Sequence, residues 1–215
     1  MRRIEVTIVD YGIGNLLSVR RGLEHCGAKV EISGDPERIF SARRVVLPGV
    51  GAFAVGMQEL RGRGLDKAVR EAANRGTPIL GICLGMQMLL DKSDEFGTTA
   101  GLGLIPGHII AVPSVDANGE TRKIPHIGWN ALILPTGREN WQGTILADVI
   151  SGESTYFVHS YMACPSNPHH RIANCSYRGQ SIAAVISRAN VSGCQFHPEK
   201  SGETGLRVLR QFLKM

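Results

Sequence analysis

The chain has no long uninterrupted hydrophobic run. Its longest charge-free apolar stretch, residues 45–57, contains a proline and several glycines and falls short of the ~20 residues that cross a bilayer as a helix. Glu5 and Asp10 interrupt the region that would form the apolar core of a signal peptide. We therefore expect a cytoplasmic protein with no transmembrane helix.

Paired cysteines are also missing, since their number is odd, their spacing is wide and no Cys-x-x-Cys motif occurs. This pattern argues against a disulfide framework and against a zinc site, and it indicates a reducing compartment. The five are Cys26, Cys83, Cys164, Cys175 and Cys194. A complete Gly-x-Gly-x-x-Gly fingerprint is absent, because Leu17 stands where a third glycine is needed after Gly12 and Gly14, and no P-loop occurs. No metal and no cofactor is expected.

Charge of one sign does not dominate, and aromatic residues are few. The 24 lysines and arginines stand against 19 acidic residues, a net charge of +5, and aromatic residues make up 6% of the chain. The basic residues are scattered and form no stripe interleaved with aromatics, as a nucleic-acid groove requires. Neither nucleic acid nor a membrane is expected as a partner.

The first half of the chain alternates between strand and helix patterns. Apolar runs that predict strands cover residues 4–10, 29–33, 43–49 and 77–83. Helical spacing of apolar residues follows over 16–26 and again over 55–74, where one or two helices break near Gly62 and Gly64. The alternation predicts a parallel, doubly wound sheet, with the continuously apolar run before Cys83 as a central strand.

The second half has a different texture. From Gly107 on, short strand-like runs are separated by glycine, proline, asparagine and serine, which favours antiparallel hairpins, and a helical stripe over 204–213 closes the chain. We predict an α/β fold with an open, mostly parallel sheet, flanking helices and antiparallel strands in the second half. The 215 residues suit a single domain spanning 1–215.

The sharpest local motif is GICLGMQ at residues 81–87, where a buried strand turns directly into a helix. A nucleophile at such an elbow points out of the sheet, and Gly81 and Gly85 permit the close backbone contacts that the turn demands. The positive end of the helix favours a thiolate at Cys83, and the N–H of Leu84 points where an oxyanion would form. Cys83 is thus a candidate nucleophile; the alternative is a buried cysteine in an ordinary turn.

A second motif, QFHPE at residues 195–199, supplies a base. Glu199 lies two residues beyond His197, on the same side of an extended chain, as Pro198 favours by disfavouring helix before it. A carboxylate there can accept a hydrogen bond from one imidazole nitrogen and leave the other free for the thiol proton. In isolation, a surface histidine beside an unrelated glutamate explains the motif equally well.

A third motif is the glycine-rich loop PGVGAF, residues 48–53, at the end of another predicted strand. In an open parallel sheet, ligands bind at the carboxyl ends of the strands, so this loop and Cys83 should face one crevice. Its glycines let backbone N–H groups approach an oxyanion closely.

Together, GICLGMQ, QFHPEKS and PGVGAF resemble the class I glutamine amidotransferases, which have a flavodoxin-like fold. Within that family, DYGIGNL, IPHIGWN and YFVHSY are similar to motifs of the glutaminase subunits of imidazole glycerol phosphate synthases. The resemblance extends from Val6 to the C-terminus.

The resemblance implies a mechanism and a set of site residues. Cys83 would attack the side-chain amide of glutamine, His197 would transfer the proton to the leaving ammonia, and Glu199 would orient the imidazole. The oxyanion hole would be formed by Leu84, Val50 and Gly51, and the glutamine would be held by Gly51, Gln87, Glu95, His159, Ser160 and Tyr161. For Glu95 a solvated loop acid, and for His159 a satisfied core histidine, are the alternatives.

Ammonia released into water is mostly protonated, so a chain that produces it needs a sealed route to an acceptor. The resemblance identifies the acceptor as a separate cyclase subunit with a (βα)8-barrel fold, forming a heterodimer for histidine biosynthesis. Residues that match the partner-facing motifs are Asn15, Pro125, Trp129 and Lys200. Trp129 is equally well explained as a core aromatic.

Two other functions remain open at this stage. A paralogous glutaminase subunit would supply ammonia to another synthase, such as an amidino-sugar enzyme of surface polysaccharides, and would carry the same motifs. An inactive scaffold is disfavoured, because Cys83, His197 and Glu199 occur together. The polar segment 113–123 and the pair His169-His170 have no interpretation.

Overall fold

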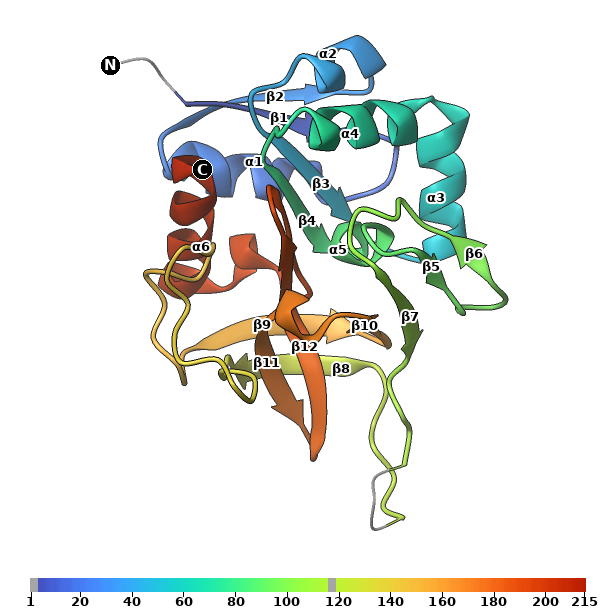
Figure 1. The fold of residues 1–215 in the computed structure, drawn as a ribbon, viewed down its shortest axis with the longest axis vertical. Coiled ribbons are helices and arrows are strands. Elements are labelled where there is room, and N and C mark those ends of the chain that lie inside the picture. Colours follow the sequence, from blue (N-terminus) through green and yellow to red (C-terminus); the bar gives the residue numbers. More distant parts are fainter. Residues whose placement is uncertain (1–3, 116–118) are drawn as a thin grey trace.

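The structure is a computed structural model that describes residues 4–115 and 119–215 (Figure 1). Residues 1–3, and residues 116–118 within the polar segment singled out above, lie outside that description. At the centre is a seven-stranded sheet. Its strands, in spatial order, are β11 (Arg171–Tyr177), β12 (Gln180–Arg188), β13 (Val191–Cys194), β4 (Ile79–Cys83), β3 (Val45–Gly49), β1 (Ile4–Val9) and β2 (Ala28–Ser33).

Helices cover both faces of this sheet, as Figure 1 shows: α1 and α6 lie on one side and α3 and α4 on the other. The helices are α1 (Leu16–His25), α2 (Pro36–Phe40), α3 (Phe53–Gly62), α4 (Leu65–Asn74), α5 (Leu84–Met88) and α6 (Gly202–Lys214). None of the helices in the described ranges is long and apolar enough to cross a membrane.

The alternation of side chains along β3 divides the core in two. Val46 packs in the cluster that includes α1 and α6, whereas Val45 and Leu47 pack in the cluster beneath α3 and α4. Because both faces are covered, every residue of β3 and of β4 is buried. This confirms the prediction that the apolar run before Cys83 is a central strand.

Two smaller sheets complete the fold. The four-stranded sheet has the order β10 (Tyr161–Pro165), β7 (Gly107–Ala111), β5 (Lys92–Ser93) and β6 (Thr99–Ala100). The two-stranded sheet pairs β8 (His126–Ala131) with β9 (Ser154–His159). Two 3-10 turns, η1 (Pro168–His170) and η2 (Pro198–Lys200), lie before β11 and α6.

The predicted fold class is confirmed. The strands β13, β4, β3, β1 and β2 are mutually parallel, and β11, β12 and β13 are antiparallel, as expected for the second half. The helical region 55–74 is two helices separated at Gly64, which has a left-handed φ of 69°. Helix α2 was not predicted, although Asp35 and Pro36 form a recognisable helix start, with Asp35 accepting a hydrogen bond from the N–H of Glu37.

Helix α6 packs directly on the turn that carries the QFHPE motif. A Cβ atom at Gly205 would collide with the carbonyl oxygen of Pro198, so only glycine allows this approach. The close contact connects the C-terminal helix to the positions of His197 and Glu199, on either side of Pro198.

We predict that Gly205→Ala destabilises the fold by about 1–3 kcal/mol, because the added methyl group overpacks a backbone contact. Gly62→Ala is the matched control: Gly62 ends a helix, has no positive φ and has open space where its Cβ would lie. Chemical denaturation of both variants tests this, and equal stabilities would contradict the packing argument.

Candidate active site

Three sequence motifs meet at the carboxyl ends of the central strands. Gly49 at the end of β3 is in register with Cys83 at the end of β4. On the other side of β4, Cys194 at the end of β13 pairs with Ile82, so the next residues of the chain continue past Cys83. The glycine-rich loop, the elbow and the QFHPE turn therefore share one edge of the sheet, as the sequence predicts.

Cys83 stands at a strained turn. Its φ of 55° and ψ of −112° place a non-glycine residue in a sparsely populated region, which costs on the order of 1–3 kcal/mol and is typical of functional sites. The flanking glycines make the turn possible: a Cβ at Gly85 would collide with the carbonyl oxygen of Leu47, and one at Gly81 would lie 2.7 Å from the Met86 nitrogen. The chain thus holds the thiol at the start of α5.

His197 and Glu199 form a buried pair. The imidazole Nδ1 lies 2.9 Å from Glu199 Oε1, and both side chains are almost fully enclosed. Burial lowers the pKa of His197, but hydrogen bonds to Cys83 and Glu199, together with the negative charges of these groups, outweigh it and raise the pKa to about 9. The site therefore favours an imidazolium beside the thiol.

Gln195 also lies beside the thiol, although it was not predicted as a site residue. Its Nε2 lies 3.9 Å from Cys83 Sγ, and its Oε1 accepts a hydrogen bond of 3.0 Å from Gln87 Nε2. Gln195 is fully buried. The sequence could have indicated this position, because residues 195 and 197 fall on the same side of an extended chain.

The thiol opens into a cavity of about 470 Å³. Of the candidate site residues, Val50, Gly51, Leu84, Gln87, Glu95, Ser160, Tyr161 and His197 line it together with Cys83. Val158 and Phe96 also line it, and neither was anticipated. Phe96 is 90% exposed at the cavity and has a positive φ of 52°.

Tyr11 contacts the glycine-rich loop. Its hydroxyl donates a hydrogen bond of 2.8 Å to the carbonyl of Pro48, and a Cβ at Gly49 would collide with the same hydroxyl. Burial and the nearby Cys83 raise the pKa of the Tyr11 phenol, so it remains a donor. The loop is therefore anchored next to the elbow.

Glu95 is not a solvated loop acid. It is only 9% exposed, and its Oε2 accepts a hydrogen bond of 2.6 Å from the N–H of Phe53, the first residue of α3. A carboxylate is favoured at a helix N-terminus. The hydrogen bond to Phe53 thus fixes the carboxylate of Glu95, which lines the cavity.

His159 is placed differently from the expectation that it contacts glutamine. It is not among the described residues that line the cavity, whereas its neighbours Val158 and Ser160 are. Successive strand residues point to opposite faces, so the side chain of His159 is buried on the other side, against His126 at 2.9 Å. The alternative interpretation, a satisfied core histidine, describes the surroundings of His159 better.

The candidate partner-facing residues Asn15, Pro125, Trp129 and Lys200 are all exposed. Trp129 is 57% exposed, so the core-aromatic alternative is wrong. Its ring lies edge-on to Tyr156, with ring centroids 6.0 Å apart, and the Tyr156 carbonyl accepts a hydrogen bond from the backbone N–H of His197. The exposed tryptophan is therefore connected to His197 through Tyr156.

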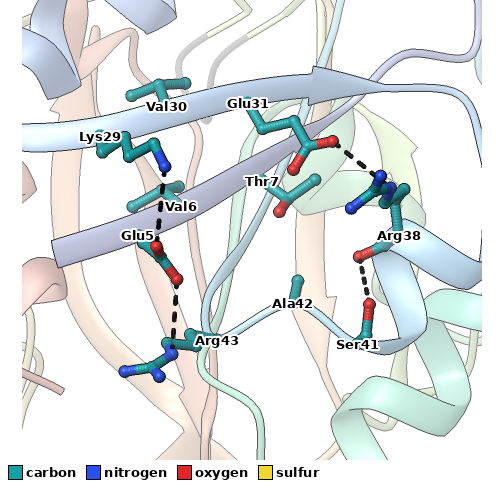
Figure 2. Close-up of a pocket in the computed structure, with 10 residues that line it drawn as sticks. All are labelled: Glu5, Val6, Thr7, Lys29, Val30, Glu31, Arg38, Ser41, Ala42 and Arg43. Carbon is teal, nitrogen blue, oxygen red and sulfur yellow. Dashed lines mark hydrogen bonds and ion pairs between the residues drawn. The ribbon is translucent and has the colours of Figure 1, made fainter.

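A second cavity, of about 310 Å³, is lined by residues of β1, β2 and α2 and by the segment 41–43 that precedes β3, as Figure 2 shows. Glu5 forms ion pairs with Lys29 at 3.9 Å and Arg43 at 3.5 Å, and Arg38 pairs with Glu31 at 3.8 Å. These charges neutralise one another at an exposed surface, at the strand ends opposite the cysteine. They do not resemble a binding site.

Comparisons with known proteins identify the family of the chain. The family model described as glutamine amidotransferase class-I matches residues 7–215. The chain is 53% identical to imidazole glycerol phosphate synthase subunit HisH 1 of Legionella pneumophila (strain Lens), covering 98% of this chain and 99% of the relative. It is 44% identical to subunit HisH of Geobacillus sp. (strain WCH70), over 96% of this chain and 95% of that one.

Solved structures show the same fold at lower identity. A structure of PurLQS from Thermotoga maritima superposes with a TM-score of 0.71 at 20% identity, covering 99% of this chain and 98% of that chain. A crystal structure of a glutamine amidotransferase gives 0.72 at 16% identity, with 97% of each chain covered. Because the family model matches residues 7–215, the chain belongs to the class I glutamine amidotransferase family.

Proposed function

We propose that this chain hydrolyses glutamine as the glutaminase subunit of an imidazole glycerol phosphate synthase. The observation that carries the proposal is the buried array of Glu199, His197 and Cys83 at the mouth of a cavity. A cysteine nucleophile needs an adjacent base that a third group orients, and these three residues meet that requirement.

In the first step, the Cys83 thiolate attacks the side-chain amide carbon of glutamine, and the proton held by His197 passes to the departing nitrogen, which leaves as ammonia. The product is a thioester between Cys83 and the glutamyl group. Water, deprotonated by His197, then attacks the thioester, releasing glutamate and restoring the thiolate–imidazolium pair. Glu199 stabilises the imidazolium in both steps.

Backbone groups stabilise the tetrahedral intermediates. We assign this role to the N–H of Leu84 and to an N–H from Val50 or Gly51, because these residues line the cavity beside Cys83. Removing one such donor typically costs a factor of about 10²–10³ in kcat. Gln87, Glu95, Ser160 and Tyr161, also at the cavity wall, would hold the amino-acid end of glutamine.

The relatives name the wider reaction, since HisH is a subunit of imidazole glycerol phosphate synthase. We infer that this chain passes its ammonia to a cyclase subunit with a (βα)8-barrel fold, in a heterodimer that serves histidine biosynthesis. The exposed Asn15, Pro125, Trp129 and Lys200 would face that partner. Complementation of a histidine auxotroph lacking its own subunit would separate this role from ammonia supply to another synthase.

Cytoplasmic residence accords with the cysteines. All five are unpaired thiols, and burial raises the pKa of Cys175 to about 12 and raises that of Cys194 as well. Buried thiols of this kind are inert and act as small apolar side chains, as a reducing compartment permits.

We predict that Cys83→Ala in the purified complex with the cyclase abolishes glutamine-dependent turnover and leaves ammonia-dependent turnover intact. The substitution removes the nucleophile but leaves the partner's chemistry untouched. Steady-state assays with glutamine and with ammonium salts measure the two activities. Cys175→Ala, which shortens another buried cysteine far along the sheet in β11, should retain both. Loss of both activities, or of neither, in Cys83→Ala contradicts the proposed function.

We predict that, in Glu199→Gln, glutamine hydrolysis is lost at a lower pH on the alkaline side of its pH profile. The raised pKa keeps His197 protonated up to about pH 9, so kcat/KM should decline above that pH in the unaltered protein. The substitution removes the negative charge that stabilises the imidazolium. The decline of kcat/KM on the alkaline side should therefore begin roughly 1 pH unit or more lower.

The pH–rate profile of the complex measures this shift. Glu203→Gln is the matched control, because Glu203 lies four residues away at the surface, in an ion pair with Arg210. An alkaline limb that stays in place in Glu199→Gln, or moves equally in both variants, would show that Glu199 does not stabilise the imidazolium.

A further inference from the structure

Two buried histidines lie side by side behind the glutamine cavity and take no part in the mechanism above. His126 on β8 is paired in register with His159 on β9, and His126 Nδ1 lies 2.9 Å from His159 Nε2. The His126 ring is stacked between Phe157, at 5.0 Å, and Tyr177, at 4.0 Å between ring centroids. These contacts pack the His126 ring against two aromatic rings and against His159.

The neighbours of His159 determine where its proton lies. Its Nδ1 lies 2.8 Å from the carbonyl of Tyr161, which can only accept, so Nδ1 carries the hydrogen. Burial, together with nearby positive charge on His126 and His197, lowers the pKa of His159 to about 4, although the bond to Tyr161 raises it. His159 is therefore neutral near pH 7, and its unprotonated Nε2 faces His126 Nδ1.

His126 connects the pair to the loop that carries Trp129. Its Nε2 lies 2.8 Å from Asn130 Oδ1, and Asn130 Nδ2 donates a hydrogen bond of 2.8 Å to the carbonyl of Ser176. Burial lowers the pKa of His126, and the contact with Asn130 opposes that shift. The pair is thus held at both ends, by Asn130 and by Tyr161.

The Tyr161 carbonyl also reaches the cavity, because it accepts a second hydrogen bond, of 3.2 Å, from Gln87 Nε2. Gln87 Nε2 donates its other hydrogen to Gln195 Oε1 at 3.0 Å. Both donors of the Gln87 amide are then occupied by protein acceptors. Since Gln87 lines the cavity, its Oε1 is the atom left to accept a hydrogen bond from a ligand.

We propose that His159, steadied by His126, is a positioning residue that fixes the Tyr161 carbonyl and thereby sets the amide of Gln87. With its orientation set, Gln87 presents an acceptor oxygen to the α-ammonium group of glutamine rather than a second donor. This inference rests on the proposed glutaminase function and adds to it a source of substrate specificity outside the cavity wall.

Two variants at one position test the proposal. In His159→Asn, the side-chain nitrogen occupies roughly the place of Nδ1 and still donates to Tyr161. In His159→Gln, the amide reaches His126 in place of Nε2, but the donor to Tyr161 is lost. Both variants remove the ring, so a merely structural role for His159 predicts similar losses in the two.

Glutamine binding is measured by calorimetry on the full chain in complex with its synthase subunit, in a Cys83→Ala background that prevents turnover. We expect His159→Gln to bind glutamine about three- to tenfold more weakly than His159→Asn, the range that one hydrogen bond confers. In the Cys83-containing proteins, the same difference should appear in KM more than in kcat. Equal affinities, or weaker binding by His159→Asn, would overturn the positioning role.

Nitrogen-15 NMR of the histidine rings in the unaltered protein tests the argument without a substitution. The proposal requires a neutral His159 with its proton on Nδ1 at pH 7, and a proton on Nε2 alone would refute it. If the Cys83→Ala protein with an unaltered His159 binds no glutamine, the proposed function itself fails. If the positioning role alone fails, the Cys83→Ala protein with an unaltered His159 still binds glutamine, and the two His159 variants bind it with equal affinity.

Discussion

The parallel pairing of β13 with β4 is the constraint on which the site depends. More than a hundred residues separate Cys83 from His197, and the chain between them leaves the parallel sheet to form the smaller sheets and the β11–β12 hairpin. It returns through β13, whose register sets Gly193 beside Gly81 and Cys194 beside Ile82. Extension of that strand by three residues then delivers the imidazole to the elbow. A slip of one residue would turn His197 to the opposite face.

The pairing also makes a buried charge tolerable. An enclosed imidazolium is costly unless it is paired and hydrogen-bonded, and His197 has Glu199 on one nitrogen and the thiol at its other side. Glu199 lies within η2 and packs against α1, where a Cβ at Gly22 would lie 3.4 Å from the Glu199 Cβ atom. Its second oxygen, Oε2, has no hydrogen-bond partner among the described residues. Within the part of the chain that the structure describes, the imidazole of His197 is therefore the hydrogen-bond partner of this carboxylate.

Local chemistry was readable from the sequence, and pairing across the chain was not. The strand before Cys83 and the elbow are formed by contiguous residues, so each was predictable from its own motif. The contact between His197 and Glu199 was also predicted, but from an extended chain, whereas Glu199 lies in the 3-10 turn η2. The insertion of β13 between β12 and β4 depends on a long-range choice of partner that no local pattern contains. His159 was misplaced because the resemblance grouped it with Ser160 and Tyr161, although strand parity turns it away from Val158 and Ser160. The burial of Glu95 depends on its bond to Phe53, on a distant helix.

The three buried histidines show how one fold separates proton transfer from recognition. His197 faces a carboxylate and a thiol, and its pKa is raised to about 9; His159 faces a carbonyl and a second imidazole, and its pKa falls to about 4. His197 therefore carries charge near neutral pH and His159 does not, and the charge of His197 itself helps to keep His159 neutral. The groups beside the thiol on the recognition side, Gln87 and Gln195, are amides that do not titrate. The binding wall can thus keep one hydrogen-bond pattern while the imidazole gives up and regains its proton through the reaction.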